Sequence, residues 1–153
     1  MRKKIMGFTL LELVIVIIIL GILATLGFAQ FQRMVERSRG AEARSVIGTI
    51  RTQAAAIYMQ NNNSLPAGTL TNAMVGIGNQ PGQISDACAA AAPSTQYFFM
   101  YGVTNAVLNQ VVITATRCTG GNGKQPGGPA ATTLILTSNL ATGADSWTGT
   151  GGY

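Results

Sequence analysis

The residues that could carry acid–base or metal chemistry are few in this chain of 153 residues. There is no histidine, and the acidic side chains are Glu12, Glu36, Glu42, Asp86 and Asp145. A Ser/His/Asp triad and a histidine-based metal site are therefore excluded by composition. A two-carboxylate hydrolase would depend on Asp86 and Asp145, and nothing near either in the sequence is suited to tune its pKa. The sequence predicts no enzyme activity, no cofactor and no metal site.

The two cysteines, Cys88 and Cys118, are the other reactive side chains. A pair with no companion cysteine or histidine is a poor metal site, whereas oxidising compartments preserve disulfides. We therefore predict a Cys88–Cys118 disulfide between the segment before the expected sheet and the end of its second strand. In the chain-entropy model, closing a loop of about 30 residues contributes ~3–4 kcal/mol.

The net charge of +5 does not favour a nucleic-acid partner, because the basic residues are not clustered on the C-terminal part. Arg2, Lys3 and Lys4 precede the apolar segment, and most of the others lie between Arg33 and Arg51. Binding to phosphates needs clustered Lys and Arg, and the residues after Arg51 offer only Arg117 and Lys124. No nucleic-acid site is predicted.

Residues 8–31 form the most distinctive segment of the chain, FTLLELVIVIIILGILATLGFAQF. As a helix rising ~1.5 Å per residue it spans roughly 36 Å, enough to cross a hydrocarbon core of about 30 Å. Its length without a turn signal favours a membrane helix over a buried strand. Glu12 is the exception, since a charge in the membrane interior costs ~2.5–3.5 kcal/mol and indicates a function. Its natural partner is a positive charge at the same depth.

Two simpler interpretations of this segment remain open. It could be a secretory signal peptide, with Gly27-Phe28-Ala29 as the cleavage site before Gln30, which would release a soluble binding domain. It could also be a plain N-terminal anchor that is never cleaved. Neither explains Glu12.

The stretch from Lys4 to Leu13, KIMGFTLLEL, resembles the class III signal of type IV prepilins and type II secretion pseudopilins. The resemblance covers about the first 50 residues, and the leader of seven residues followed by Phe8 is closer to type IVa than to type IVb pilins. It implies that prepilin peptidase cuts between Gly7 and Phe8 and that Phe8 is then N-methylated. It also implies that Glu12 neutralises the amine of a neighbouring subunit in a filament. The assembly residues that follow from it are Phe8, Glu12, Leu13, Ile17, Leu20 and Gly21.

One position departs from the family pattern, because many members have a proline where this chain has Ala29. Proline would kink a helix, whereas Ala29 should continue it. Gly21 and Gly27 weaken the helix by roughly 1 kcal/mol each relative to alanine.

The helix is expected to continue to about Met59. Ala43, Ile47, Ile50, Ala54 and Ile57 recur at helical spacing and should pack on a sheet. Arg33, Arg37, Arg44 and Arg51 form a second stripe on this helix. Two interpretations stay open for the stripe: it contacts neighbouring subunits or acidic lipid headgroups, or it is a solvated flank. Asn61 to Pro66 should end the helix.

Three strands are predicted in the C-terminal half, at Gln96–Val103, Ala106–Arg117 and Thr132–Thr137. Residues 65–93 read as a long loop with a short helix near Ala87–Ala92. Residues 145–153 read as an exposed tail with Trp147 against the sheet, and Tyr97 to Tyr101 as core and interface packing. A meander of three or four antiparallel strands on the helix gives an α+β fold. The expected divisions are a cleaved leader at 1–7, a membrane or filament-core helix at 8–31, an amphipathic helix at 32–60 and a head at 61–153.

These expectations combine into a structural role. The predicted protein is a major type IV pilin that polymerises with copies of itself into a surface filament for adhesion, twitching motility or DNA uptake. Its other partners would be prepilin peptidase, the pilus assembly machinery of the inner membrane and, before assembly, membrane lipid. Alternatives are a minor pilin and a type II secretion pseudopilin; the major pseudopilin tends to bind calcium, and Asp86 and Asp145 offer few ligands for it. Asn62-Asn63-Ser64 fits a weak glycosylation pattern.

Overall fold

The computed structural model describes residues 8–66, 70–78, 84–86, 88, 97–118 and 132–150. Its elements are helix α1 (Leu10–Gln60), the short 3-10 helix η1 (Ile84–Asp86) and strands β1 (Phe99–Val107), β2 (Gln110–Arg117), β3 (Thr133–Asn139) and β4 (Asp145–Gly149). The chain divides into two compact units, Met1–Arg37 and Ser38–Tyr153, and α1 contributes residues to both.

Helix α1 is continuous from Leu10 to Gln60 and runs through Ala29 without interruption, as the absence of a proline there predicted. It ends where the asparagine run was expected to end it. Asn62 and Asn63 have positive φ angles of 54° and 59°, the left-handed conformation that asparagine tolerates better than most residues. The helix therefore stops because its sequence supplies residues that leave the helical conformation at little cost.

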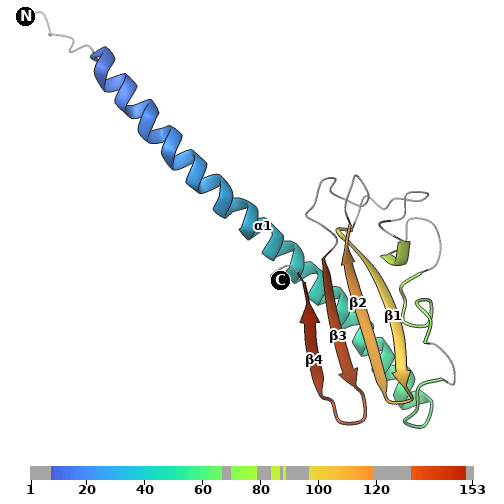
Figure 1. Ribbon diagram of the computed structural model, residues 1–153. Helices are drawn as coiled ribbons and strands as arrows, with labels where there is room; N and C mark the ends of the chain where they lie inside the picture. The colour runs from blue at the N-terminus through green and yellow to red at the C-terminus, as the bar shows by residue number, and fades with distance from the viewer. Residues whose placement is uncertain are drawn as a thin grey trace, which may run out of the picture. The chain divides into compact units, whose positions relative to one another are not determined.

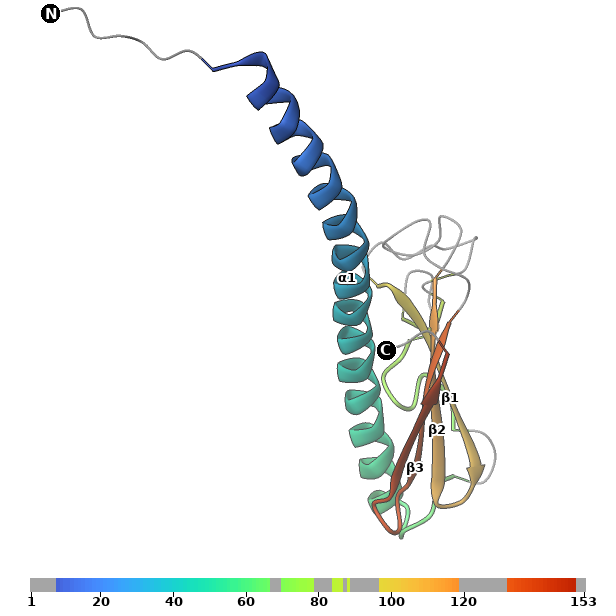
Figure 2. The same cartoon turned by 60° about the vertical axis from the view of Figure 1, so that its left-hand side comes forward.

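The four strands form one antiparallel sheet in the order β1-β2-β3-β4, so each strand pairs with its neighbour in sequence. Within the second unit, the C-terminal part of α1 lies along one face of this sheet (Figures 1 and 2). Burial alternates along β2 and β3, with every second side chain facing the helix. The predicted α+β fold, a long helix and a small antiparallel sheet, is confirmed.

The strand boundaries differ from the predicted ones in two places. Ala106 and Val107 were assigned to the second strand but extend β1, and the turn falls at Leu108 and Asn109. The predicted tail was also wrong for residues 145–149, which form the edge strand β4, although all five residues are exposed. The short helix expected near Ala87–Ala92 lies mostly outside the described residues; η1 precedes it.

The core of the second unit lies between the apolar face of the helix and the inner face of the sheet. Ala43, Ile47, Ile50 and Ala54 are buried as predicted, and Ile57 is partly buried against them. The sheet contributes Phe99, Tyr101, Val103, Val111, Ile113, Ala115, Leu134 and Leu136 to the core, and Tyr58, Leu65, Leu70, Val75 and Ile77 are buried in the same cluster. Burial of this apolar area is what holds the helix on the sheet.

Strand β1 is an edge strand whose free side is partly covered by residues 70–78. The backbone N–H of Val103 donates to Oδ1 of Asn72 at 3.0 Å, and the N–H of Leu70 donates to Oδ1 of Asn105 at 2.5 Å. Two asparagine side chains thus take the place of a neighbouring strand. Covering an edge in this way limits pairing with other chains.

Tyr101 provides the first prediction. Its side chain is buried in the core, and among the described residues its hydroxyl has no hydrogen-bond partner. Burial, with smaller contributions from Glu42 and Tyr97, raises its pKa well above the ordinary value. Tyr101→Phe should therefore be neutral or stabilise the protein by up to about 1 kcal/mol, because it removes an unpaired buried hydroxyl. Urea unfolding of both proteins at neutral pH measures this, and a loss above about 1 kcal/mol would contradict it.

The raised pKa also gives this prediction a pH dependence. Above about pH 10 a tyrosine in the unfolded chain loses its proton while buried Tyr101 keeps it. The unfolded state then binds fewer protons, so this residue lowers stability as the pH rises through that range. The advantage of Tyr101→Phe over wild type should grow between pH 9 and 11, around the ordinary tyrosine pKa of about 10.

Candidate functional site

The N-terminal part of α1 presents an exposed apolar surface. Every large apolar side chain in residues 8–31 is exposed in the isolated chain, and none of the most apolar window is buried. Within the described residues, α1 is the one helix that is long and apolar enough to cross a membrane. An apolar surface of this extent indicates burial in lipid or against other protein chains.

The first turn of α1 is built around Glu12 and Thr9. Oε2 of Glu12 accepts hydrogen bonds from the backbone N–H of Thr9 at 3.1 Å and from its hydroxyl at 3.0 Å. In return, the backbone N–H of Glu12 donates to Oγ1 of Thr9 at 3.3 Å. This is a capping box, in which a threonine and a glutamate three residues apart satisfy the donors of the helix start. The carboxylate is thereby held at the beginning of the helix.

The other predicted assembly residues share the helix with Glu12. Leu13, Ile17 and Leu20 are spaced four and three residues apart, so they lie on one face, and all three are exposed. A Cβ added to Gly21 would meet no atom within 4 Å, so nothing in the described part of the chain requires glycine there. Phe8 is exposed at the start of the described residues, and Gly7 lies outside them.

Arginines on the C-terminal part of α1 contact the sheet of their own chain. Nε of Arg51 lies 2.9 Å from Oδ1 of Asp145 and donates at 3.0 Å to the buried hydroxyl of Ser138. The guanidinium of Arg44 lies 6.0 Å from the ring centroid of Trp147. Arg44 and Arg51 therefore contact β4 of their own chain, although Arg44 is exposed and Arg51 is half-buried, and both interpretations of the stripe stay predictions.

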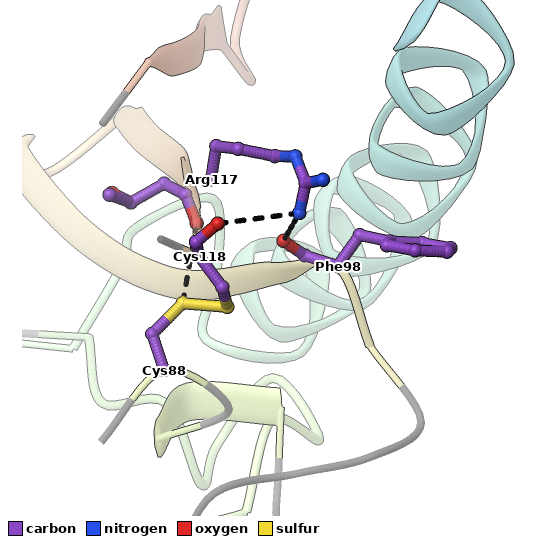
Figure 3. The surroundings of a disulfide bond; sticks show 5 residues. Cys88, Phe98, Arg117 and Cys118 are labelled. Carbon is purple, nitrogen blue, oxygen red and sulfur yellow. Dashed lines mark hydrogen bonds between the residues drawn. A yellow bond between two sulfur atoms is a disulfide. The ribbon is translucent and has the colours of Figure 1, made fainter. Parts of the chain in front are cut away.

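The disulfide corner is held by a buried arginine. Cys88 and Cys118 form the predicted disulfide, with their Cα atoms 5.1 Å apart. Arg117 beside it is 1% exposed, and its Nη1 donates to the carbonyl of Phe98 at 2.9 Å and, more weakly, to that of Cys118 at 3.4 Å (Figure 3). Its guanidinium also lies 5.3 Å from the ring centroid of Phe98, whose ring has the guanidinium of Arg39 at 4.8 Å as well. The corner thus combines a covalent bond, charge-assisted hydrogen bonds and cation–π contacts, which include one between Arg117 and the ring of Phe99 at 5.6 Å.

The roles of Thr9 and Arg117 were missed by reasoning from the sequence. The sequence signal for the capping box was present, since Thr9 and Glu12 have the required types and spacing before an apolar run. Arg117 gave a weaker signal: it continues the inward alternation of Val111, Ile113 and Ala115, but its charge suggested exposure.

Comparison with known proteins identifies the N-terminal segment. Residues 2–28 match the family model described as the prokaryotic N-terminal methylation motif. No solved structure shows a significant match to the chain. The match covers the basic leader, Gly7 and Phe8, the capping box and most of the apolar segment.

Proposed function

The chain carries the prepilin-type methylation signal of type IV pilins and pseudopilins, and from this premise we propose that it is the major subunit of a type IV pilus. The subunit polymerises through its N-terminal helix into a surface filament that serves adhesion, twitching motility or DNA uptake. The observation that carries the proposal is the exposed apolar surface of residues 8–31, which bears a single carboxylate and follows the methylation signal. Such a surface is suited first to lipid and then to copies of itself.

Each predicted site residue has a role in this proposal. Prepilin peptidase cuts between Gly7 and Phe8, and Phe8 is methylated. The carboxylate of Glu12 pairs with the amine of a neighbouring subunit, which gives both charges a partner in an apolar environment. Leu13, Ile17 and Leu20 pack between subunits, and the open space at Gly21 is consistent with close approach of a neighbouring helix.

The same residues account for where the subunit is found before and after assembly. The precursor is held in the inner membrane by residues 8–31, and the assembly machinery then moves the subunit from lipid into the surface filament. The disulfide supports a head outside the cytoplasm, where oxidising conditions preserve such bonds.

The major pseudopilin of type II secretion is the main alternative, and the ion pair of Asp145 weighs against it. Calcium takes six to eight oxygen ligands, several of them usually carboxylates. Arg51 already pairs with the carboxylate of Asp145 at 2.9 Å. Among the described residues, no group of three or more metal-ligating side chains occurs.

The experiment that tests the proposal is an intact-mass measurement on sheared filaments. We expect an abundant chain that begins at methylated Phe8 and is lighter by the hydrogens lost on forming the Cys88–Cys118 disulfide. A chain beginning at Phe8 but confined to the membrane would favour a pseudopilin or a minor pilin instead. A soluble chain beginning at Gln30 would rule out the filament.

A further inference from the structure

The capping box consists of atoms that survive processing. Its donors and acceptors belong to Thr9 and Glu12, and the expected cut between Gly7 and Phe8 removes none of them. The mature chain therefore keeps its carboxylate fixed in the first helical turn. The new terminal amine of Phe8 is then one residue from Thr9.

The two bonds to the carboxylate both end on the same oxygen. Thr9 donates its backbone N–H and its hydroxyl to Oε2 of Glu12. In the part of the chain that the structure describes, no donor contacts Oε1. Thr9 thus fixes one carboxylate oxygen, and the other, which has no donor among the described residues, can accept one from another chain.

We propose that Thr9 is a positioning residue that orients the Glu12 carboxylate for the amine of the incoming subunit. The inference rests on the proposed filament function. A free glutamate side chain would lose rotamer freedom when the contact between subunits forms, whereas here much of that ordering is complete in the unassembled subunit. The capping bonds and the contact between subunits use different oxygens, so both exist together in the filament.

The test compares three variants of the full-length chain. Thr9→Val keeps the size and shape but removes the hydroxyl, and Thr9→Ser restores a hydroxyl. Thr25→Val is the matched control, because Thr25 lies in the same apolar helix and donates its hydroxyl to the carbonyl of Ile22 at 2.8 Å, away from Glu12. The readout is the amount of sheared filament divided by the amount of chain processed to Phe8, so that any change in cleavage cancels.

We expect Thr9→Val to lower this ratio about five-fold, the factor that corresponds to a lost cap of ~1 kcal/mol. Thr9→Ser and Thr25→Val should stay within about two-fold of wild type, because serine caps as well as threonine and Thr25 has no contact with Glu12. A wild-type ratio for Thr9→Val, or an equal loss in Thr9→Ser, would overturn the positioning role. A lack of filaments in wild type itself would instead overturn the proposed function.

A second measurement does not depend on filaments. In detergent micelles, the backbone amide of Glu12 should exchange its hydrogen several-fold faster in Thr9→Val than in wild type or Thr9→Ser, because its acceptor is removed. An unchanged exchange rate would show that the hydroxyl does not hold this turn, and the proposal would fail even if filament yield fell.

Discussion

Glu12→Ala is expected to lower the yield of sheared filaments more than ten-fold while leaving cleavage and methylation at Phe8 largely intact. The reason is the cost of an unpaired charge in an apolar environment, which is ~2.5–3.5 kcal/mol on insertion scales. In the proposed filament this carboxylate and the amine of a neighbouring subunit neutralise each other. Without Glu12 that amine is buried alone, and each 1.4 kcal/mol of cost is about a ten-fold loss in an equilibrium constant.

The measurement separates assembly from processing. Intact mass on the membrane fraction gives the fraction of chains that begin at methylated Phe8, and the sheared fraction gives assembly. Glu36→Ala is the control, since it removes a carboxylate from the same helix outside the apolar segment and should change yield less than two-fold. A wild-type filament yield for Glu12→Ala would refute the pairing of Glu12 with an amine.

The long helix and its inner face could be predicted from the sequence because both depend on local pattern. The apolar spacing from Ala43 to Ala54 places those residues on one face, and a sheet covers that face. The end of the helix followed from Asn62 and Asn63 for an equally local reason. The disulfide followed from there being only two cysteines, with no companion cysteine or histidine that would make them a metal site.

Strand β4 could not be predicted because its own sequence, DSWTG, has little strand character. It forms through its neighbours: β3 supplies the backbone partners, and two helical arginines hold Asp145 and Trp147. All of these contacts join residues far apart in the chain. Propensity within a window of residues cannot register them.

The candidate site likewise contains one feature that depends on neighbouring residues in the sequence and one that depends on residues far apart in it. The capping box lies within four residues and can be read directly from Thr9 and Glu12 once the helix start is known. The burial of Arg117 depends on Phe98, on the cysteine corner and on the helix, which come together only in the folded head. The alternation of buried residues along β2 predicts that Arg117 faces inward, but it does not predict which groups Arg117 contacts there.

Arg117→Ala is expected to lower the free energy of unfolding of the head by about 3–5 kcal/mol, the range for losing a large, well-packed buried side chain. The loss has two physical sources. One is the cavity left beneath the disulfide corner, and the other is the loss of charge-assisted hydrogen bonds to the carbonyls of Phe98 and Cys118. The protein should be measured at full length in detergent, with the disulfide intact, by urea unfolding. Trp147 in β4 is the single tryptophan and reports on the head.

Arg117→Met separates the two sources, because it keeps most of the volume and removes the hydrogen bonds. We expect it to lose about 1–3 kcal/mol, less than alanine, since the carbonyl of Phe98 still accepts from the backbone N–H of Cys118 at 3.0 Å. Arg33→Ala, which removes an exposed arginine, should change stability by no more than about 0.5 kcal/mol. An Arg117→Met variant as stable as wild type would contradict this expectation, because the cost of desolvating the buried charge would then offset its hydrogen bonds. That result would show that packing alone holds the corner and that the guanidinium bonds add nothing to its stability.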